Sequence, residues 1–156
     1  MLTQPGTYAL IMTCNYDQQV TIGKLGRLQV RPGCYVYIGS AFGPGGLKAR
    51  IAHHQRISVR PHWHIDYLRS LLLLKEVWYT NDAEPYEHRW AEVLSGLKGA
   101  SIPITGFGAS DCSCTSHLFA FTDQPPFRSF RRRLHTRVLS HGPIIQHKLA
   151  GHAHRG

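Results

Sequence analysis

Tyr8, Tyr37, Arg50 and Glu87 are side chains of the types that act on phosphate esters with the help of a cation. Cross-strand neighbours in a sheet lie about 5 Å apart, so Tyr8 and Tyr37 can meet if their strands pair. The planar guanidinium of Arg50 suits phosphate oxygens. Glu87 stands at the start of an expected helix, and a single carboxylate can hold a Mg²⁺ that keeps its waters. Together, these residue types fit a site for a phosphate ester and a divalent cation.

A glycine-rich segment, GSAFGPGG at residues 39–46, follows the second tyrosine. Gly39 has no side chain, so a phosphate backbone can come close to the sheet surface there. We expect Ser40 and Gly46 to belong to the same surface of approach. Each of the four side chains named first also has an ordinary interpretation. Tyr8 and Tyr37 would be ordinary sheet residues, Arg50 a solvated helix residue or part of a surface ion pair, and Glu87 an acid favoured by a helix N-terminus.

A second polar group is expected at the edge of the same cleft. An aspartate that orients a neighbouring histidine would fit a hydrogen-bonded network that shapes the choice of substrate, although Asp111 could equally cap a helix or turn. The members of this group are His62, His64, Asp66, Ser110 and Asp111.

A zinc site is the alternative use of these residues, because histidine and thiolate are zinc ligands. Its ligands would be His62, His64, Cys112 and Cys114. The Cys-x-Cys spacing is tighter than the usual Cys-x₂-Cys, which favours the polar network. The other two cysteines, at 14 and 34, are expected as buried, reduced residues on strands.

Several segments rich in β-branched and aromatic residues, separated by turn residues, predict strands. Four of them form a meander, an apolar strand follows near residues 77–79, and the last strand is residues 117–121. The meander strands are residues 6–13, 18–22, 27–30 and 34–39.

About three helices are expected. The second follows His62-Trp63-His64, and the third starts at Pro85, a favourable first-turn residue. The first follows the glycine-rich turn, and one face of it carries Leu47, Arg50, Ile51 and His54. The pattern predicts an α+β domain with a small, mainly antiparallel sheet flanked by these helices.

Charge divides the chain unevenly. The 18 Lys and Arg outnumber the 9 Asp and Glu, and no acidic residue follows Asp123. We therefore expect a domain over residues 1–124 and a basic tail over 125–156, helical near 127–139 and then flexible. Its histidines, at 141, 147, 152 and 154, are expected to bind metal only adventitiously.

Arg131, Arg132 and Arg133, with Phe127 and Phe130 beside them, predict an arm that contacts nucleic-acid phosphates without reading sequence. The alternative is a solvated basic end that aids solubility. The N-terminal residues do not form a signal-peptide pattern, and no apolar run, Leu71–Leu74 included, is long enough to cross a bilayer. A cytoplasmic protein without a membrane partner is expected.

Taken together, the motifs resemble the GIY-YIG nuclease superfamily: two tyrosine-containing strand motifs, a helical arginine and a later glutamate at a helix start. They stand here as GTY (6–8), YVYIG (35–39), LKARIAHH (47–54) and YEHRWAEVL (86–94). The chain is still more similar to a branch of that superfamily found alone or fused to DNA-repair enzymes. That branch carries GKLG (23–26), GSAFGPGGLKAR (39–50), HWHIDYL (62–68) and GFGASDCSCTSHL (106–118).

The resemblance implies a metal-dependent endonuclease that hydrolyses DNA rather than RNA, in the repair or processing of structured DNA, with a DNA-repair protein as partner. Tyr8 or His54 would help to deprotonate the attacking water, and Tyr37 would position the water or the phosphate. Arg50 would neutralise transition-state charge. Glu87 would hold one divalent ion, Mg²⁺ or Mn²⁺, which stabilises the leaving oxyanion.

Two departures from the family pattern favour an alternative. The tyrosine motifs stand farther apart than is typical, so residues 18–30 must loop out before the motifs can meet. The family places an asparagine late in the domain, whereas none follows Asn81 here, and Ser110 or Asp111 would take its place. The alternative is a non-catalytic nucleic-acid-binding module that keeps the fold, and a zinc-stabilised interaction protein is a further one.

Overall fold

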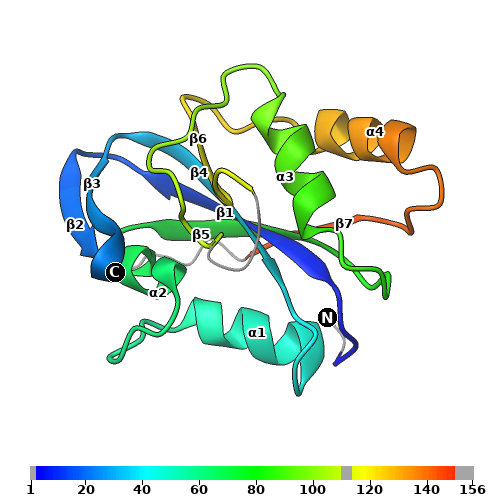
Figure 1. The fold of residues 1–156 in the computed structure, drawn as a ribbon, viewed down its shortest axis with the longest axis horizontal. Coiled ribbons are helices and arrows are strands. Elements are labelled where there is room, and N and C mark those ends of the chain that lie inside the picture. The colour runs from blue at the N-terminus through cyan, green and yellow to red at the C-terminus, as the bar shows by residue number, and fades with distance from the viewer. Residues whose placement is uncertain (1–2, 110–113, 150–156) are drawn as a thin grey trace.

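The protein is described by a computed structural model that covers residues 3–109 and 114–149. The centre of the fold is a five-stranded sheet, whose order is β6-β4-β1-β5-β7 and whose pairings are all antiparallel (Figure 1). The predicted α+β class with an antiparallel sheet is confirmed. The strands are β1 (Thr7–Cys14), β4 (Gly33–Ser40), β5 (Leu73–Thr80), β6 (Leu118–Phe121) and β7 (Ile145–Lys148).

β2 (Gln18–Ile22) and β3 (Gly26–Val30), joined by the 3₁₀ turn η1 (Gly23–Leu25), form a separate two-stranded sheet. The expected meander is therefore wrong in its pairing, because β1 pairs directly with β4 and β5. Almost every residue of β1 is buried, so both faces of the sheet around it are covered, whereas β2 alternates between half-buried and exposed residues and ends at the buried Ile22. The expected looping-out of residues 18–30 is confirmed.

Two pairs of helices cover the two faces of the large sheet (Figure 1). α1 (Gly46–Gln55) and α2 (His64–Arg69) cover one face, while α3 (Glu87–Ser95) and α4 (Phe127–Arg137) cover the other. Successive strand residues point to opposite faces. Leu10 of β1 accordingly packs in the core with α1 and α2, and Ile11 packs in the core with α3 and α4.

The start of α3 is tied to the first residue of β1. The helix begins at Glu87, two residues after the predicted start at Pro85. The Tyr86 backbone N–H donates to Thr7 Oγ1 at 3.2 Å, and Thr7 pairs with Ser40 at the end of β4. This connection carries Glu87 to the end of β4, although the two elements lie far apart in the sequence.

The expected domain boundary after residue 124 is wrong for the described part of the chain. The helix foreseen near 127–139 exists as α4, but its Phe130 and Leu134 are fully buried in the core beside Trp90 of α3. Further on, β7 completes the edge of β5. Residues one helical turn apart thus anchor α4, and backbone pairing anchors β7, so both belong to the domain. Residues 150–156 of the expected flexible end lie outside the described residues.

His141 is also part of this core. Its ring stacks on Tyr86 with the ring centroids 4.0 Å apart, Trp90 Nε1 donates to its Nε2 at 3.0 Å, and its Nδ1 bonds to the Gly142 carbonyl at 2.7 Å. An indole N–H can only donate and a carbonyl oxygen can only accept, so Nε2 carries no proton. Both ring nitrogens are engaged in hydrogen bonds, so the expectation that His141 binds metal adventitiously is wrong.

Replacing His141 with phenylalanine should make stability less sensitive to acid. Burial lowers the pKa of His141 below its ordinary value of 6.5, whereas the unfolded chain regains that value. The unfolded state therefore binds more protons as the pH falls below about 6.5, and the stability present at neutral pH is progressively lost. Urea unfolding at pH 7 and pH 5 should show a smaller loss for His141→Phe than for the native chain. His147→Phe, at an exposed position of β7, should lose as much unfolding free energy between pH 7 and pH 5 as the native chain. Equal losses in the native chain and His141→Phe would show that His141 does not contribute to the acid sensitivity.

Among the described residues, no helix is long and apolar enough to span a membrane.

Candidate functional site

A cleft of about 320 Å³ opens where β4 ends, bordered by α1 and by the first residues of α3. It gathers side chains from segments that are distant in the sequence. The predicted site residues that line it are Tyr37, Gly39, Ser40, Arg50, His62, His64 and Glu87. Trp63, His88, Gly108 and His117 complete its wall.

Glu87 is held by two neighbours and still reaches the cleft. Ser40 Oγ donates to its Oε1 at 2.6 Å, and His117 Nδ1 lies 3.5 Å from its Oε2. Burial lowers the pKa of His117, and the charge of Glu87 opposes this shift. The Ser40 bond fixes the direction of the Glu87 carboxylate. Because the side chain keeps 28% exposure, the carboxylate remains accessible from the cleft.

Arg50 faces the same cleft from α1. Its Nη1 donates to the Ser40 carbonyl at 2.7 Å, and its guanidinium lies over the Trp63 ring, 4.4 Å from the centroid. A guanidinium has five N–H donors in one plane, more than the Ser40 contact uses. Stacking on Trp63 fixes that plane, which suits the recognition of an anion.

Tyr8 and His54 form a buried pair behind this cleft. Tyr8 Oη lies 2.6 Å from His54 Nε2, and each residue is only 1% exposed. Burial raises the pKa of Tyr8 well above its ordinary value, with Tyr37 adding to the rise and Arg50 opposing it. Burial also lowers the pKa of His54 to about 3, and the charge of His53 adds to this shift. Tyr8 is therefore protonated and His54 uncharged at neutral pH.

Gly39 makes room for Tyr8. The two residues are cross-strand partners, and a Cβ atom on Gly39 would lie 2.5 Å from Tyr8 Cζ. The space that the missing side chain leaves is thus filled by the phenol. Gly39 still lines the cleft, but we find that its first structural role is to accommodate Tyr8.

Tyr37 is the tyrosine that reaches the cleft. It stands two residues before Gly39 on β4, so it shares a face of the sheet with Tyr8. Its ring packs edge-on against His54 and Phe107, with centroid distances of 6.1 and 5.9 Å. Burial raises the pKa of Tyr37, Glu87 adds to the rise and Arg50 opposes it. The strands of the two tyrosines pair, but Tyr8 lies opposite Gly39 and Tyr37 opposite Leu10, so the tyrosines are offset by two residues on one face. Tyr37 lines the cleft, and Tyr8 lies behind it.

The second polar group is arranged differently from the prediction. Asp66 does not orient His62 or His64 through its side chain. Its Oδ1 lies 2.8 Å from His53 Nε2, and its Oδ2 accepts the backbone N–H groups of His62 and Trp63, both at 2.9 Å. Asp66 is the third residue of α2, where a carboxylate can cap the free N–H groups that precede the helix.

His64 has a backbone partner, because its Nδ1 accepts the Gly108 N–H at 2.8 Å. This bond fixes the segment that carries Gly108 against α2. Ser110, Asp111 and Cys112 lie outside the described residues. The polar network and the zinc site that were predicted with these residues therefore stay predictions.

Gly46 does not approach a substrate. It begins α1 with a φ of +61°, a region that favours glycine, and a Cβ atom there would collide with the Thr3 carbonyl. The next N–H, of Leu47, donates to the Gln4 carbonyl at 3.0 Å. The N-terminal segment covers Gly46, so the expectation of a substrate contact at this residue is wrong.

Three residues of the site were given no role from the sequence. His53 is the partner of Asp66, Trp63 supports Arg50, and His117 lies beside Glu87. The helical periodicity that selected His54 argues against its neighbour His53, because residues i and i+1 do not share a face. The repeated histidines of HH (53–54) and HWH (62–64) were the available signal.

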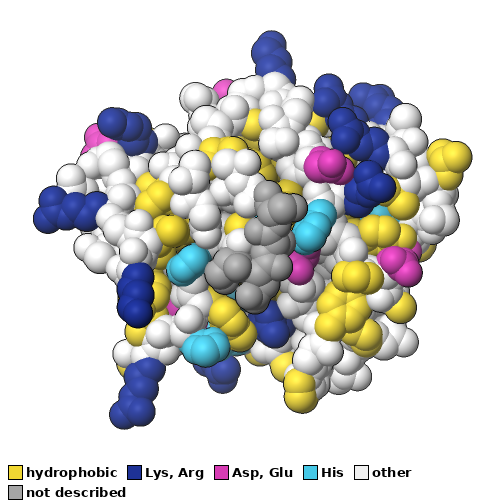
Figure 2. Space-filling view, in the orientation of Figure 1, with side chains coloured by type: hydrophobic (Ala, Val, Ile, Leu, Met, Phe, Trp, Pro, Cys, Tyr) yellow, Lys and Arg dark blue, Asp and Glu magenta, His cyan; other side chains and the backbone are white. Residues whose placement is uncertain are grey.

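Arg131, Arg132 and Arg133 lie exposed on α4 and do not line the cleft. Figure 2 shows Lys and Arg side chains gathered at the upper right of this face, over α4. Arg133 Nη1 also donates to the Gly96 carbonyl at 3.0 Å, which joins α4 to the end of α3. The basic surface is thus part of the folded domain.

The fold and the cleft define a class of α+β domain: an antiparallel sheet between two helix pairs, with a phenol, a guanidinium and a carboxylate gathered where one central strand ends. Residues 7–140 match the family described as the domain of unknown function DUF123, and the chain belongs to that family. Comparison with curated proteins and with solved structures gives no match to the chain.

Proposed function

We propose that this protein is a metal-dependent endonuclease of the GIY-YIG type, which hydrolyses phosphodiester bonds in DNA. One observation carries the proposal: Tyr37, Arg50 and Glu87, selected from three separate motifs, line a single cleft. Each motif alone has an ordinary structural explanation. Their convergence on one accessible surface is what a site for phosphoryl chemistry requires.

Glu87 fits the requirements of a cation ligand. A Mg²⁺ or Mn²⁺ ion that keeps most of its waters needs only one or two carboxylates. The Glu87 carboxylate is partly exposed, and the Ser40 hydroxyl fixes its direction. Such an ion, when bound, supplies charge stabilisation for the leaving oxygen.

The other cleft residues supply orientation and positive charge. Arg50, stacked on Trp63, presents N–H donors to phosphate oxygens and offsets the charge that develops on them. We assign to Tyr37 the contact with the attacking water or the phosphate, because its side chain lines the cleft. The neutral Tyr8–His54 pair supports Tyr37 from behind, and its two side chains are joined by a hydrogen bond.

A second candidate function is nucleic-acid binding without turnover. Tyr8 and His54 are almost completely buried, and burial raises the pKa of both Tyr8 and Tyr37. Neither phenol is ionised at neutral pH without a further cation, which weakens both as bases. This observation favours a module that holds phosphates and does not cut them.

Direct assay separates the two functions. The full chain is incubated with labelled branched, single-stranded and duplex DNA, and with RNA of matching form, in Mg²⁺, in Mn²⁺ or in EDTA. Cleavage of DNA that stops in EDTA supports the nuclease. Salt-sensitive binding of the same substrates without any cleavage supports the binding module, and preferred cleavage of RNA would contradict the choice of DNA.

Removing two exposed arginines of α4 should reduce the salt dependence of DNA binding. Each phosphate contact contributes about 0.7–0.9 to the slope of log K against log salt, so Arg131→Gln with Arg132→Gln should lower the slope by about 1.5. Fluorescence anisotropy titrations at about 50–200 mM salt, where counterion release has a large effect on affinity, measure this slope. Lys24→Gln with Arg27→Gln removes the same charge from two exposed positions of the β2–β3 hairpin and should leave the slope unchanged. Equal slopes for the native chain and the α4 variant would exclude this surface from DNA binding.

A further inference from the structure

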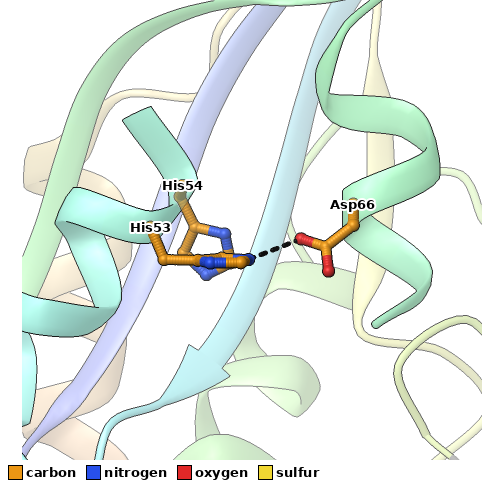
Figure 3. Close-up of side chains that lie close together, drawn as sticks. All are labelled: His53, His54 and Asp66. Atoms are coloured by element: carbon orange, nitrogen blue, oxygen red, sulfur yellow. Dashed lines mark hydrogen bonds and ion pairs between the residues drawn. The ribbon is translucent and has the colours of Figure 1, made fainter. Parts of the chain in front are cut away.

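His53, His54 and Asp66 converge between the end of α1 and the start of α2 (Figure 3). One ligand atom from each lies within 4.8 Å of the other two. His53 Nε2 and Asp66 Oδ1 are 2.8 Å apart. The Glu87 carboxylate, with its Ser40 and His117 contacts, is not part of this group.

His54 adds a second and independent observation. Its Nε2 is taken by Tyr8, and its Nδ1 has no hydrogen-bond partner among the described residues. The residue is only 1% exposed, so water does not satisfy that nitrogen from the surface. A buried polar atom without a partner costs stability and calls for an explanation such as a bound ion.

We propose that His53 Nε2, His54 Nδ1 and Asp66 Oδ1 bind a divalent transition metal of the Zn²⁺ class. Two imidazoles and a carboxylate suit Zn²⁺ or Co²⁺, whereas Mg²⁺ prefers an all-oxygen environment. Three protein ligands leave a fourth position for water or another ligand. The His53 side chain keeps 29% exposure, which gives the ion a route of entry.

The surroundings are built to hold these ligands in place. Asp66 Oδ2 accepts two backbone N–H groups, which fix the carboxylate. Its Oδ1, 2.8 Å from His53 Nε2, is the oxygen that would exchange this contact for the ion. The charge of Asp66 opposes the positive charges of Arg50 and Arg69, which both act on His54. With a metal on Nδ1, the proton of the His54 ring resides on Nε2, so the ring donates to Tyr8 Oη.

The test is a titration of the EDTA-treated full chain with Co²⁺, followed by its visible absorption. The native chain should bind one Co²⁺ ion, seen as a visible absorption band that saturates at one equivalent. Zn²⁺ should displace the Co²⁺ and abolish the band. His53→Gln should weaken binding by at least about tenfold. His53 is partly exposed, so this variant should fold, and Asp66→Asn is a second variant that keeps the size of the side chain. Zn²⁺ should raise the melting temperature of the native chain more than that of either variant.

His62→Gln is the matched control, because His62 is an exposed neighbour that supplies only its backbone N–H to Asp66. It should bind Co²⁺ like the native chain. Unchanged binding by His53→Gln, loss of binding in His62→Gln, or no binding by the native chain would each overturn the proposal. A strong near-ultraviolet thiolate band would also overturn it, because the cation would then be held by cysteine. Since no step of this test measures cleavage, its outcome is separate from that of the nuclease proposal.

Discussion

Replacing Glu87 with glutamine should lower metal-dependent DNA cleavage by about 10³-fold or more, because the cleft loses the anionic ligand of its cation. A loss of about 4 kcal/mol of transition-state stabilisation corresponds to this factor. Glutamine keeps the size of the side chain and can still accept the Ser40 hydroxyl bond, which measures 2.6 Å in the native protein. The fold should therefore survive. Initial rates over a range of Mn²⁺ concentrations, with melting temperatures measured alongside, provide the readout.

The matched control is Glu84→Gln, which removes the same charge from an exposed position just before α3. It should cleave at the native rate. Arg50→Lys, which keeps the charge but loses the planar fork stacked on Trp63, should fall between the two. If Glu87→Gln cleaves as fast as the native chain, Glu87 is not the cation ligand and the proposed chemistry fails.

Replacing Gly39 with alanine should destabilise the protein by about 2–3 kcal/mol, because an added methyl group overpacks a filled core. Its Cβ would lie 2.5 Å from Tyr8 Cζ, and Tyr8 is held in place by full burial and by the bond of its hydroxyl to His54. Neither the ring nor the backbone can move aside cheaply. Urea unfolding at neutral pH measures the change in the free energy of unfolding.

A double-mutant cycle identifies the cause of this loss. Tyr8→Leu removes the atoms that the new methyl group would meet, so Gly39→Ala should cost much less in that background. Gly43→Ala, where an added Cβ meets nothing within 4 Å, should change stability by less than about 0.5 kcal/mol. An equal cost for Gly39→Ala in both backgrounds would show that Tyr8 is not the residue that requires glycine.

The sequence was most informative where a local pattern determines the structure. The β-branched and aromatic residues of CYVYIG at 34–39 predict β4, and the helical recurrence of Leu47 and Ile51 predicts the buried face of α1. Tyr37, Arg50 and Glu87 were found because their residue types, order and family resemblance agreed. The structure adds their convergence on one cleft.

The misses depend on distant pairing, which local patterns do not encode. β7, the segment IQHK, is exposed along its whole length and carries no alternation, so only its backbone bonds to β5 make it a strand. The meander prediction failed for the same reason, since consecutive strands usually pair but β1 pairs with β4 across an intervening hairpin. Gly46 looked like a surface glycine because nothing in its neighbourhood shows that residues 3–4 cover it.

The last strand of the sheet has a consequence for how the chain is made. A ribosome releases β5 long before β7 emerges, so one edge of β5 has no partner strand while the helix α4 is still being translated. During that interval the apolar segment Val77–Tyr79 belongs to an open edge, the kind of surface that pairs with other nascent chains. Translation that stalls before Ile145 should therefore yield an aggregation-prone product, even though every residue of the cleft has already been synthesised.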